Sequence, residues 1–196
     1  LIMATLPINV VIINLLIKSE KMTFRMILGI VLSIAGIATI ILGTEGSISL
    51  EGTYTKGVIL LILSEIGFAL YTVKSKVLIS KYSVYQVMFL VILFAFIPFL
   101  IISSKEILSF PITSLSMITW IGIIFTGIFG SCVANIFWYR GIHRLGSTKT
   151  SVYANLPPVF GIFVSFLFLG ETLTFLQMFG GIIILSGVII VNRKKA

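Results

Sequence analysis

The chain has 196 residues, of which 58% are hydrophobic and only 10% are charged, with a mean hydropathy of +1.20 and a formal net charge of +8. A soluble domain carries about 25% charged residues, so this composition excludes an ordinary soluble protein. The positive charge does not indicate a nucleic-acid-binding protein, because the basic residues occupy short gaps between long apolar runs.

Seven apolar runs follow one another along the chain. Each is long enough to cross a hydrocarbon core of about 30 Å as a helix. Strands of a membrane barrel would instead be about 10 residues long and alternate in polarity. The sequence therefore predicts an all-α integral membrane protein with seven transmembrane helices. They cover residues 1–17, 24–43, 57–73, 85–102, 115–139, 150–169 and 173–191.

The basic residues favour one side of this predicted membrane. Twelve of the fourteen Lys and Arg residues lie in alternate gaps and at the C-terminus, whereas Lys56 and Lys105 lie on the other side with four of the six acids. Cytoplasmic loops are enriched in Lys and Arg. We therefore expect a multi-pass protein of the cell membrane whose C-terminus is cytoplasmic.

Two stretches of the chain, residues 4–37 and 154–188, resemble each other. The segment Ala4-Thr5-Leu6-Pro7 returns as Ala154-Asn155-Leu156-Pro157. After a slip of one residue, five further positions return: Glu20, Thr23, Phe24, Gly29 and Gly36 as Glu171, Thr174, Phe175, Gly180 and Gly187. A duplication built from membrane-spanning segments is typical of secondary transporters.

The repeat is predicted to be inverted. The first copy forms predicted helices one and two and the second forms helices six and seven, so the motif returns after five crossings and must run in the opposite direction. We expect residues 1–43 to be the last two helices of a first repeat truncated at its N-terminus. Residues 44–56 would be an extracytoplasmic linker, and residues 57–196 a complete second repeat of five helices. Symmetry then predicts three further helices before Leu1, and ten in all.

The other repeated residues are interpreted as structural. Small residues let helix backbones approach closely, which assigns four glycines to packing: Gly29, Gly36, Gly180 and Gly187. A carboxylate near a helix N-terminus is favourable, so Glu20 and Glu171 are expected at caps or turns ahead of the helices that follow them.

The second half of the chain resembles a known family. Residues 140–147, residues 153–160 with Pro157-Pro158, the turn Gly170-Glu171-Thr172 and the glycine-rich final helix are similar to the closing half of an EamA-type transporter of the drug/metabolite transporter superfamily. The resemblance covers essentially the whole chain. It implies a ten-helix fold with two five-helix inverted repeats, export of small metabolites, and cytoplasmic termini. The chain departs from the pattern in lacking the first three helices, and in having Lys and Ser where a Gly usually precedes Glu20.

Glu65 is the most informative single residue of the predicted cavity. It lies near the middle of an apolar helix, where a charged side chain costs about 2.5–3.5 kcal/mol. It must therefore face a protein interior or a watery cavity. A proton-coupling or cation-binding group and a neutral acid bonded to a neighbouring helix both remain open.

A polar stripe marks the fifth predicted helix. Ser131, Asn135 and Trp138 are spaced three and four residues apart, so they share one helix face and are candidates to line a cavity. Interfacial anchoring is the alternative for Trp138 and Tyr139, because they lie beside Arg140.

Prolines occupy equivalent places in the repeated helices. Pro7 has Asn9 nearby, and Pro157 is accompanied by Pro158 and Asn155, with Tyr153 one turn earlier. A proline removes a backbone donor and kinks a helix, and paired breaks in two repeats are the best pointer to a binding site at the membrane midplane. Kinks that serve packing alone are equally consistent with the sequence.

These features together predict a secondary transporter or exporter of small metabolites, such as amino acids or drugs, that works by alternating access. No phosphate-binding glycine loop, metal-ligand motif or nucleophile–base pair is present, so we expect neither an enzyme nor a cofactor nor a bound metal. The expected partners are a small-molecule substrate, a coupled proton or other ion, the lipid bilayer and a second copy of the chain in a homodimer, but not nucleic acid. Two alternatives stay open: a non-transporting scaffold or partner-binding subunit, and an inactive fragment of a ten-helix transporter.

Overall fold

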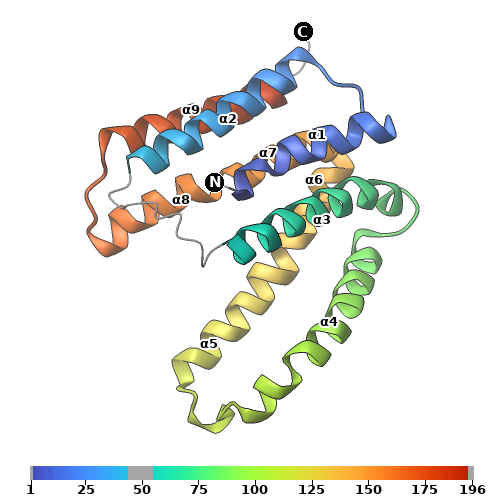
Figure 1. Ribbon diagram of the computed structural model, residues 1–196, viewed down its shortest axis with the longest axis vertical. Helices are drawn as coiled ribbons and strands as arrows, with labels where there is room; N and C mark the ends of the chain where they lie inside the picture. Colours follow the sequence, from blue (N-terminus) through green and yellow to red (C-terminus); the bar gives the residue numbers. More distant parts are fainter. Residues whose placement is uncertain (1, 44–54, 194–196) are drawn as a thin grey trace. The chain divides into compact units, whose positions relative to one another are not determined.

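The structure, a computed structural model, describes residues 2–43 and 55–193 (Figure 1). All regular elements in these two ranges are helical, so the prediction of an all-α chain is confirmed. The predicted linker, residues 44–56, lies outside the described residues except for its last two, which begin a helix.

Six helical segments are long and apolar enough to cross a membrane in the described part of the chain. The sequence and the fold together therefore identify a multi-pass membrane protein. The segments are α2 (Phe24–Leu42), α3 (Thr55–Ile79), α4 (Val84–Ser109), Met117–Leu145, Ser147–Leu169 and α9 (Phe175–Asn192). The first predicted span is shorter: a 3-10 turn, η1 (Ile2–Thr5), leads into the apolar helix α1 (Leu6–Ile17).

Two of these segments are composite. The segment Met117–Leu145 consists of α5 (Met117–Phe125), a π-helical stretch η4 (Thr126–Val133) and α6 (Ala134–Leu145). The segment Ser147–Leu169 is interrupted more strongly. It consists of α7 (Ser147–Val152), the 3-10 turn η5 (Tyr153–Asn155), α8 (Pro157–Val164) and a π-helical end η6 (Ser165–Leu169).

The chain forms two compact units, which are described separately. One comprises Leu1–Lys74 with Leu145–Ala196, and the other comprises Ser75–Arg144. The first unit therefore combines both copies of the sequence repeat, although they lie far apart along the chain.

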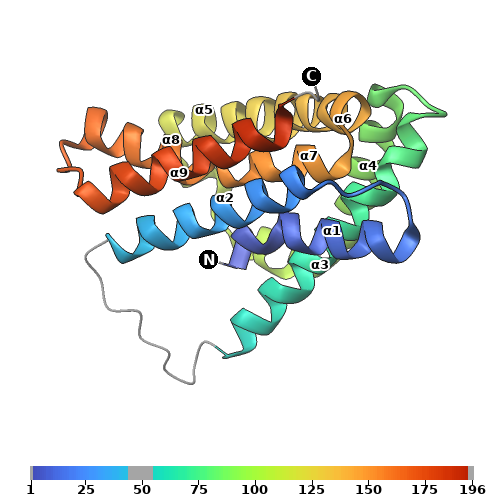
Figure 2. The same cartoon turned by 90° about the horizontal axis from the view of Figure 1, so that it is seen from above.

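The core of the first unit is the pair of helices α2 and α9, which lie side by side in both views (Figures 1 and 2). Glycines hold their backbones close together. A Cβ atom added to Gly29 would lie 2.6 Å from the carbonyl oxygen of Gly187, and one added to Gly36 would lie 2.7 Å from that of Gly180. Side chains at these positions would push the helices apart, so the prediction that the four repeated glycines serve packing is confirmed.

The contacts of this pair repeat about a two-fold axis. Gly29 meets Gly187 and Val191, and its repeat counterpart Gly180 meets Gly36 and Ile40. Adding 151 to residues 29, 36 and 40 gives residues 180, 187 and 191, so one contact is the symmetry copy of the other. The residue numbers of α9 fall as those of α2 rise, and the helices are therefore antiparallel, as an inverted repeat requires.

The two ends of the α2–α9 pair carry different turns. At one end α2 begins and α9 finishes, next to the basic turn of residues 18–21; we call this the basic end. At the other end the hydroxyl of Thr174, at the start of α9, donates a hydrogen bond to the carbonyl oxygen of Gly43 at 3.1 Å. The turn of residues 170–173 lies there. The two turns of the repeated hairpins are thus at opposite ends of the pair.

Candidate functional site

The two repeated helices each begin with a 3-10 turn followed by proline. Pro7 is the second residue of α1, two positions after η1 ends, and Pro157 and Pro158 begin α8, two positions after η5 ends. Proline suits a first helical turn because its fixed φ is already helical and the missing N–H would be unpaired there. At each proline a 3-10 turn thus passes into an α-helix, and we call these two places the breaks; that they kink the helices stays a prediction. The turns η1 and η5 contact each other, so the structure brings the two breaks together.

Asn155 ends η5 at this meeting of the breaks. Its side chain is fully buried, and neither its amide nitrogen nor its amide oxygen has a hydrogen-bond partner in the described residues. A buried polar group without a partner costs about 1–3 kcal/mol, so an orphaned amide needs an explanation. A polar ligand that reached this position would find one donor group and one acceptor unoccupied.

The other predicted residues near the breaks are less enclosed. Asn9 on α1 is half-buried, and Tyr153 at the start of η5 is exposed. Their assignment as lining residues stays a prediction.

Glu65 lies on the one buried stripe of α3 within the first unit. The side chains at positions 65, 69, 72 and 73 are buried, whereas most of the helix is exposed. Glu65 is 9% exposed, and its Oε2 has no hydrogen-bond partner in the part of the chain that the structure describes. The carboxyl group is thus buried against protein, whereas its proposed role as a coupling or cation-binding group stays a prediction.

The predicted stripe of the fifth span belongs to the second unit and lies at the junction of η4 with α6. Asn135 donates its amide N–H to the carbonyl oxygen of Ser131 at 2.7 Å. This hydrogen bond uses one N–H of the Asn135 amide. It lies next to a π-helical stretch, and wide π turns often occur at functional sites. Asn135 and Trp138 are half-buried and Ser131 is exposed. Tyr139 is fully buried, so the alternative of an interfacial anchor facing lipid is wrong for Tyr139.

The sequence did not single out a polar cluster at the N-terminus of α7. Glu20 accepts hydrogen bonds from the backbone nitrogens of Ser147 (2.8 Å) and Thr148 (3.1 Å), and from the Ser147 hydroxyl (3.0 Å). Asn14, fully buried, donates to the hydroxyls of both residues at 2.9 Å. The signal that could have found this cluster is Asn14 itself, a polar residue inside an apolar run.

Gly146 leaves room for the Glu20 carboxylate because it has no side chain. Its φ of +91° is one that residues with a Cβ rarely adopt, and an added Cβ would lie 2.6 Å from Glu20 Oε1. Glu20 thus lies in the turn ahead of α2, one of the two expected places, but its carboxylate caps α7 and not α2. Thr23 caps α2, and its counterpart Thr174 caps α9.

The chain is similar to known membrane transporters. The model of the EamA-like transporter family matches residues 55–193. The chain is 26% identical over 98% of its length to the uncharacterized transporter YetK of Bacillus subtilis, and 25% identical over 96% to the uncharacterized transporter YyaM of the same organism. An uncharacterized transporter of Archaeoglobus fulgidus is 27% identical over 96% of the chain. The chain spans 58–65% of the length of these relatives.

Proposed function

The chain belongs to the EamA-like transporter family, and on this premise we propose that the intact protein is a secondary transporter that moves small polar metabolites, such as amino acids or drugs, out of the cell. The proposed place is the cell membrane, with the C-terminus of the chain in the cytoplasm. The bias of the basic residues toward one set of gaps supports this orientation.

The orphaned amide of Asn155 carries the proposal. It lies where the 3-10 turns that lead into the two repeated helices meet, and paired irregularities of this kind in two repeats are where transporters place their substrates. A neutral polar group of the substrate would supply the missing partners: an acceptor for the Asn155 N–H and a donor for its amide oxygen. A substrate with an adjacent carbonyl and N–H or hydroxyl fits this requirement.

The symmetry of α2 and α9 supports alternating access as the mechanism. Two halves related by a two-fold axis can exchange conformations, so that a site between them opens to one side and then to the other. The glycine contacts keep α2 and α9 close together, so we propose that this pair remains closed while other helices move. No nucleotide-binding motif is present in the sequence, so the proposed energy source is a gradient of a proton or another ion.

The proposal is tested by replacing Asn155 with leucine in the intact protein. Leucine is similar in size and removes both unpaired polar groups, so we expect thermal stability in detergent to stay equal or rise. Flux of the transported compound, found by screening labelled amino acids, nucleosides and organic cations in proteoliposomes, should fall at least tenfold.

Asn192→Leu is the matched control, because Asn192 lies at the basic end, away from the breaks, and its amide donates to the Val188 carbonyl oxygen. It should transport normally. Unchanged flux through the Asn155→Leu protein would contradict the proposed site, and the absence of flux for the whole panel would favour a scaffold or an inactive fragment.

A further inference from the structure

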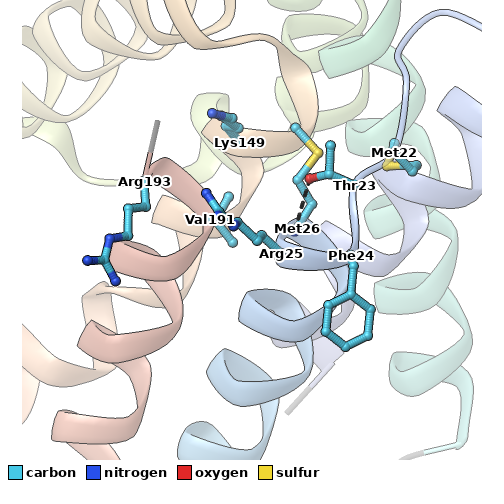
Figure 3. Close-up of a pocket in the computed structure, with 8 residues that line it drawn as sticks. All are labelled: Met22, Thr23, Phe24, Arg25, Met26, Lys149, Val191 and Arg193. Atoms are coloured by element: carbon cyan, nitrogen blue, oxygen red, sulfur yellow. Dashed lines mark hydrogen bonds between the residues drawn. The ribbon is translucent and has the colours of Figure 1, made fainter. Parts of the chain in front are cut away.

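The basic end of the α2–α9 pair contains a cavity of about 530 Å³ (Figure 3). It is formed by three segments that are distant in sequence: the start of α2, the first turn of α7 and the end of α9. Its lining residues are Met22, Thr23, Phe24, Arg25, Met26, Lys149, Val191 and Arg193.

The cavity is strongly cationic. Its lining residues include three cations from three different segments, Arg25, Lys149 and Arg193, and no acid (Figure 3). Glu20 is the nearest acid along the chain, and it is hydrogen-bonded to Ser147 and Thr148 at the start of α7. Even if its charge is counted, the cations remain in excess.

The fold keeps these three cations together. The contact of Gly29 with Gly187 and Val191 sets the start of α2 against the end of α9, which brings Arg25 and Arg193 to the same end. The hydrogen bonds of Glu20 and Asn14 hold the first turn of α7, which carries Lys149. To set the orientation of a protein in the membrane, basic residues need only occur in the cytoplasmic loops. The orientation rule does not explain why three of them line one cavity.

Apolar residues at the start of α2 also line the cavity. Phe24 is 77% exposed at the start of a membrane-spanning helix, and Met22 and Met26 are half-buried beside it. A small anion dissolved in water gains nothing from such a surface. A phospholipid does gain, because its phosphate can contact the basic residues while its acyl chain contacts the apolar ones.

We propose that this cavity binds the headgroup of an anionic phospholipid. Arg25, Lys149 and Arg193 contact the phosphate, and Phe24 contacts the start of an acyl chain. The three cations lie at the ends of membrane-spanning helices, which is the depth of lipid headgroups, and basic pockets of this kind bind acidic lipids. The inference concerns a site separate from Asn155 and does not depend on transport.

The test measures lipid binding to the detergent-purified intact protein by native mass spectrometry. The probes are phosphatidylglycerol and phosphatidylcholine with identical acyl chains, with inorganic phosphate as a competitor. We expect phosphatidylglycerol to bind at least tenfold more tightly than phosphatidylcholine. Each basic residue near an anionic lipid contributes roughly a fivefold gain in affinity, so replacing all three residues by glutamine should weaken phosphatidylglycerol binding on the order of a hundredfold.

The matched control removes three exposed basic residues outside the cavity: Lys74→Gln, Lys81→Gln and Arg144→Gln. It should change the affinity by less than threefold, and a charge-keeping variant with Arg25→Lys, Lys149→Arg and Arg193→Lys should still bind. If the triple glutamine protein does not fold, Lys149→Gln and Arg193→Gln are measured singly, each with an expected fivefold loss.

Three results would overturn the proposal. They are equal binding of the two lipids, equal loss in the cavity variants and the control, and displacement of phosphatidylglycerol by inorganic phosphate at the same concentration. The last result would identify a site for free anions.

Discussion

Glu20 Oε1 accepts hydrogen bonds from both the backbone nitrogen and the hydroxyl of Ser147, a residue 127 positions away along the chain. The carboxylate thus caps a helix of the second repeat from the turn of the first. A negative charge at a helix N-terminus is favourable because the first N–H groups there lack partners and the helix dipole is positive. The two copies of the repeat are joined by this contact as well as by the α2–α9 pair.

Replacing Glu20 with alanine is therefore expected to destabilise the protein. The backbone nitrogens of Ser147 and Thr148 would lose their acceptor, and charge-assisted hydrogen bonds of this kind contribute about 1.5–3 kcal/mol when buried; because Glu20 is half-buried we expect the low end. The measurement is the midpoint of thermal unfolding in detergent. Glu171→Ala is the control, since Glu171 is the repeat counterpart and is exposed. An equal drop in both variants would contradict the capping role.

Replacing Gly187 with alanine should disrupt the α2–α9 pair. The added Cβ would lie 2.5 Å from both the carbonyl oxygen of Gly29 and the hydroxyl of Ser33, and backbone atoms cannot move aside without separating the helices. Overpacking of this kind costs about 1–3 kcal/mol, so the unfolding midpoint should fall clearly.

Gly67→Ala is the matched control for this change. Gly67 is also helical, on α3, and a Cβ there would meet no described atom within 4 Å. Its unfolding midpoint should stay equal or rise, because alanine is the better helix former. A milder effect of Gly187→Ala than of Gly67→Ala would show that α2 and α9 are not in close contact.

The inverted arrangement predicts opposite accessibility of the two hairpin turns. Single cysteines at Ser19 and Thr172, each in an intact protein freed of other cysteines, should react with a membrane-impermeant maleimide from opposite sides of sealed vesicles. Both positions are exposed, so the reagent can reach them. Labelling of both from one side would contradict the inverted repeat.

Glu65→Gln tests the proposed coupling to an ion. Glutamine keeps the size and one acceptor of the buried carboxyl group but cannot exchange a proton. If Glu65 carries the coupled proton, flux through the Glu65→Gln protein should no longer respond to an imposed pH gradient, while exchange of substrate without a gradient continues. Flux that follows the gradient as in the unaltered protein would assign Glu65 to structure.

The sequence alone determined the elements that depend on local physics. Continuous apolar runs of this length must be helices in a bilayer, because a backbone without water has to bond to itself and barrel strands are shorter and alternate in polarity. The repeated glycines and prolines also indicated their structural roles. A close helix contact requires glycine, and a proline requires a helix start or break. The antiparallel packing of Gly29 on Gly187 follows the pattern that the duplication predicted.

Only the tertiary structure decided which distant polar groups meet. Glu20 lies in the turn before α2, where a cap or a turn is predicted, but Thr23 caps α2 and the Glu20 carboxylate reaches Ser147 instead. Nothing local distinguishes these outcomes, since both helix starts offer unpaired N–H groups. The isolation of the Asn155 amide and the gathering of Arg25 with Lys149 are equally long-range. Hydrogen bonding and burial depend on which distant segments pack together, and the local sequence does not specify those neighbours.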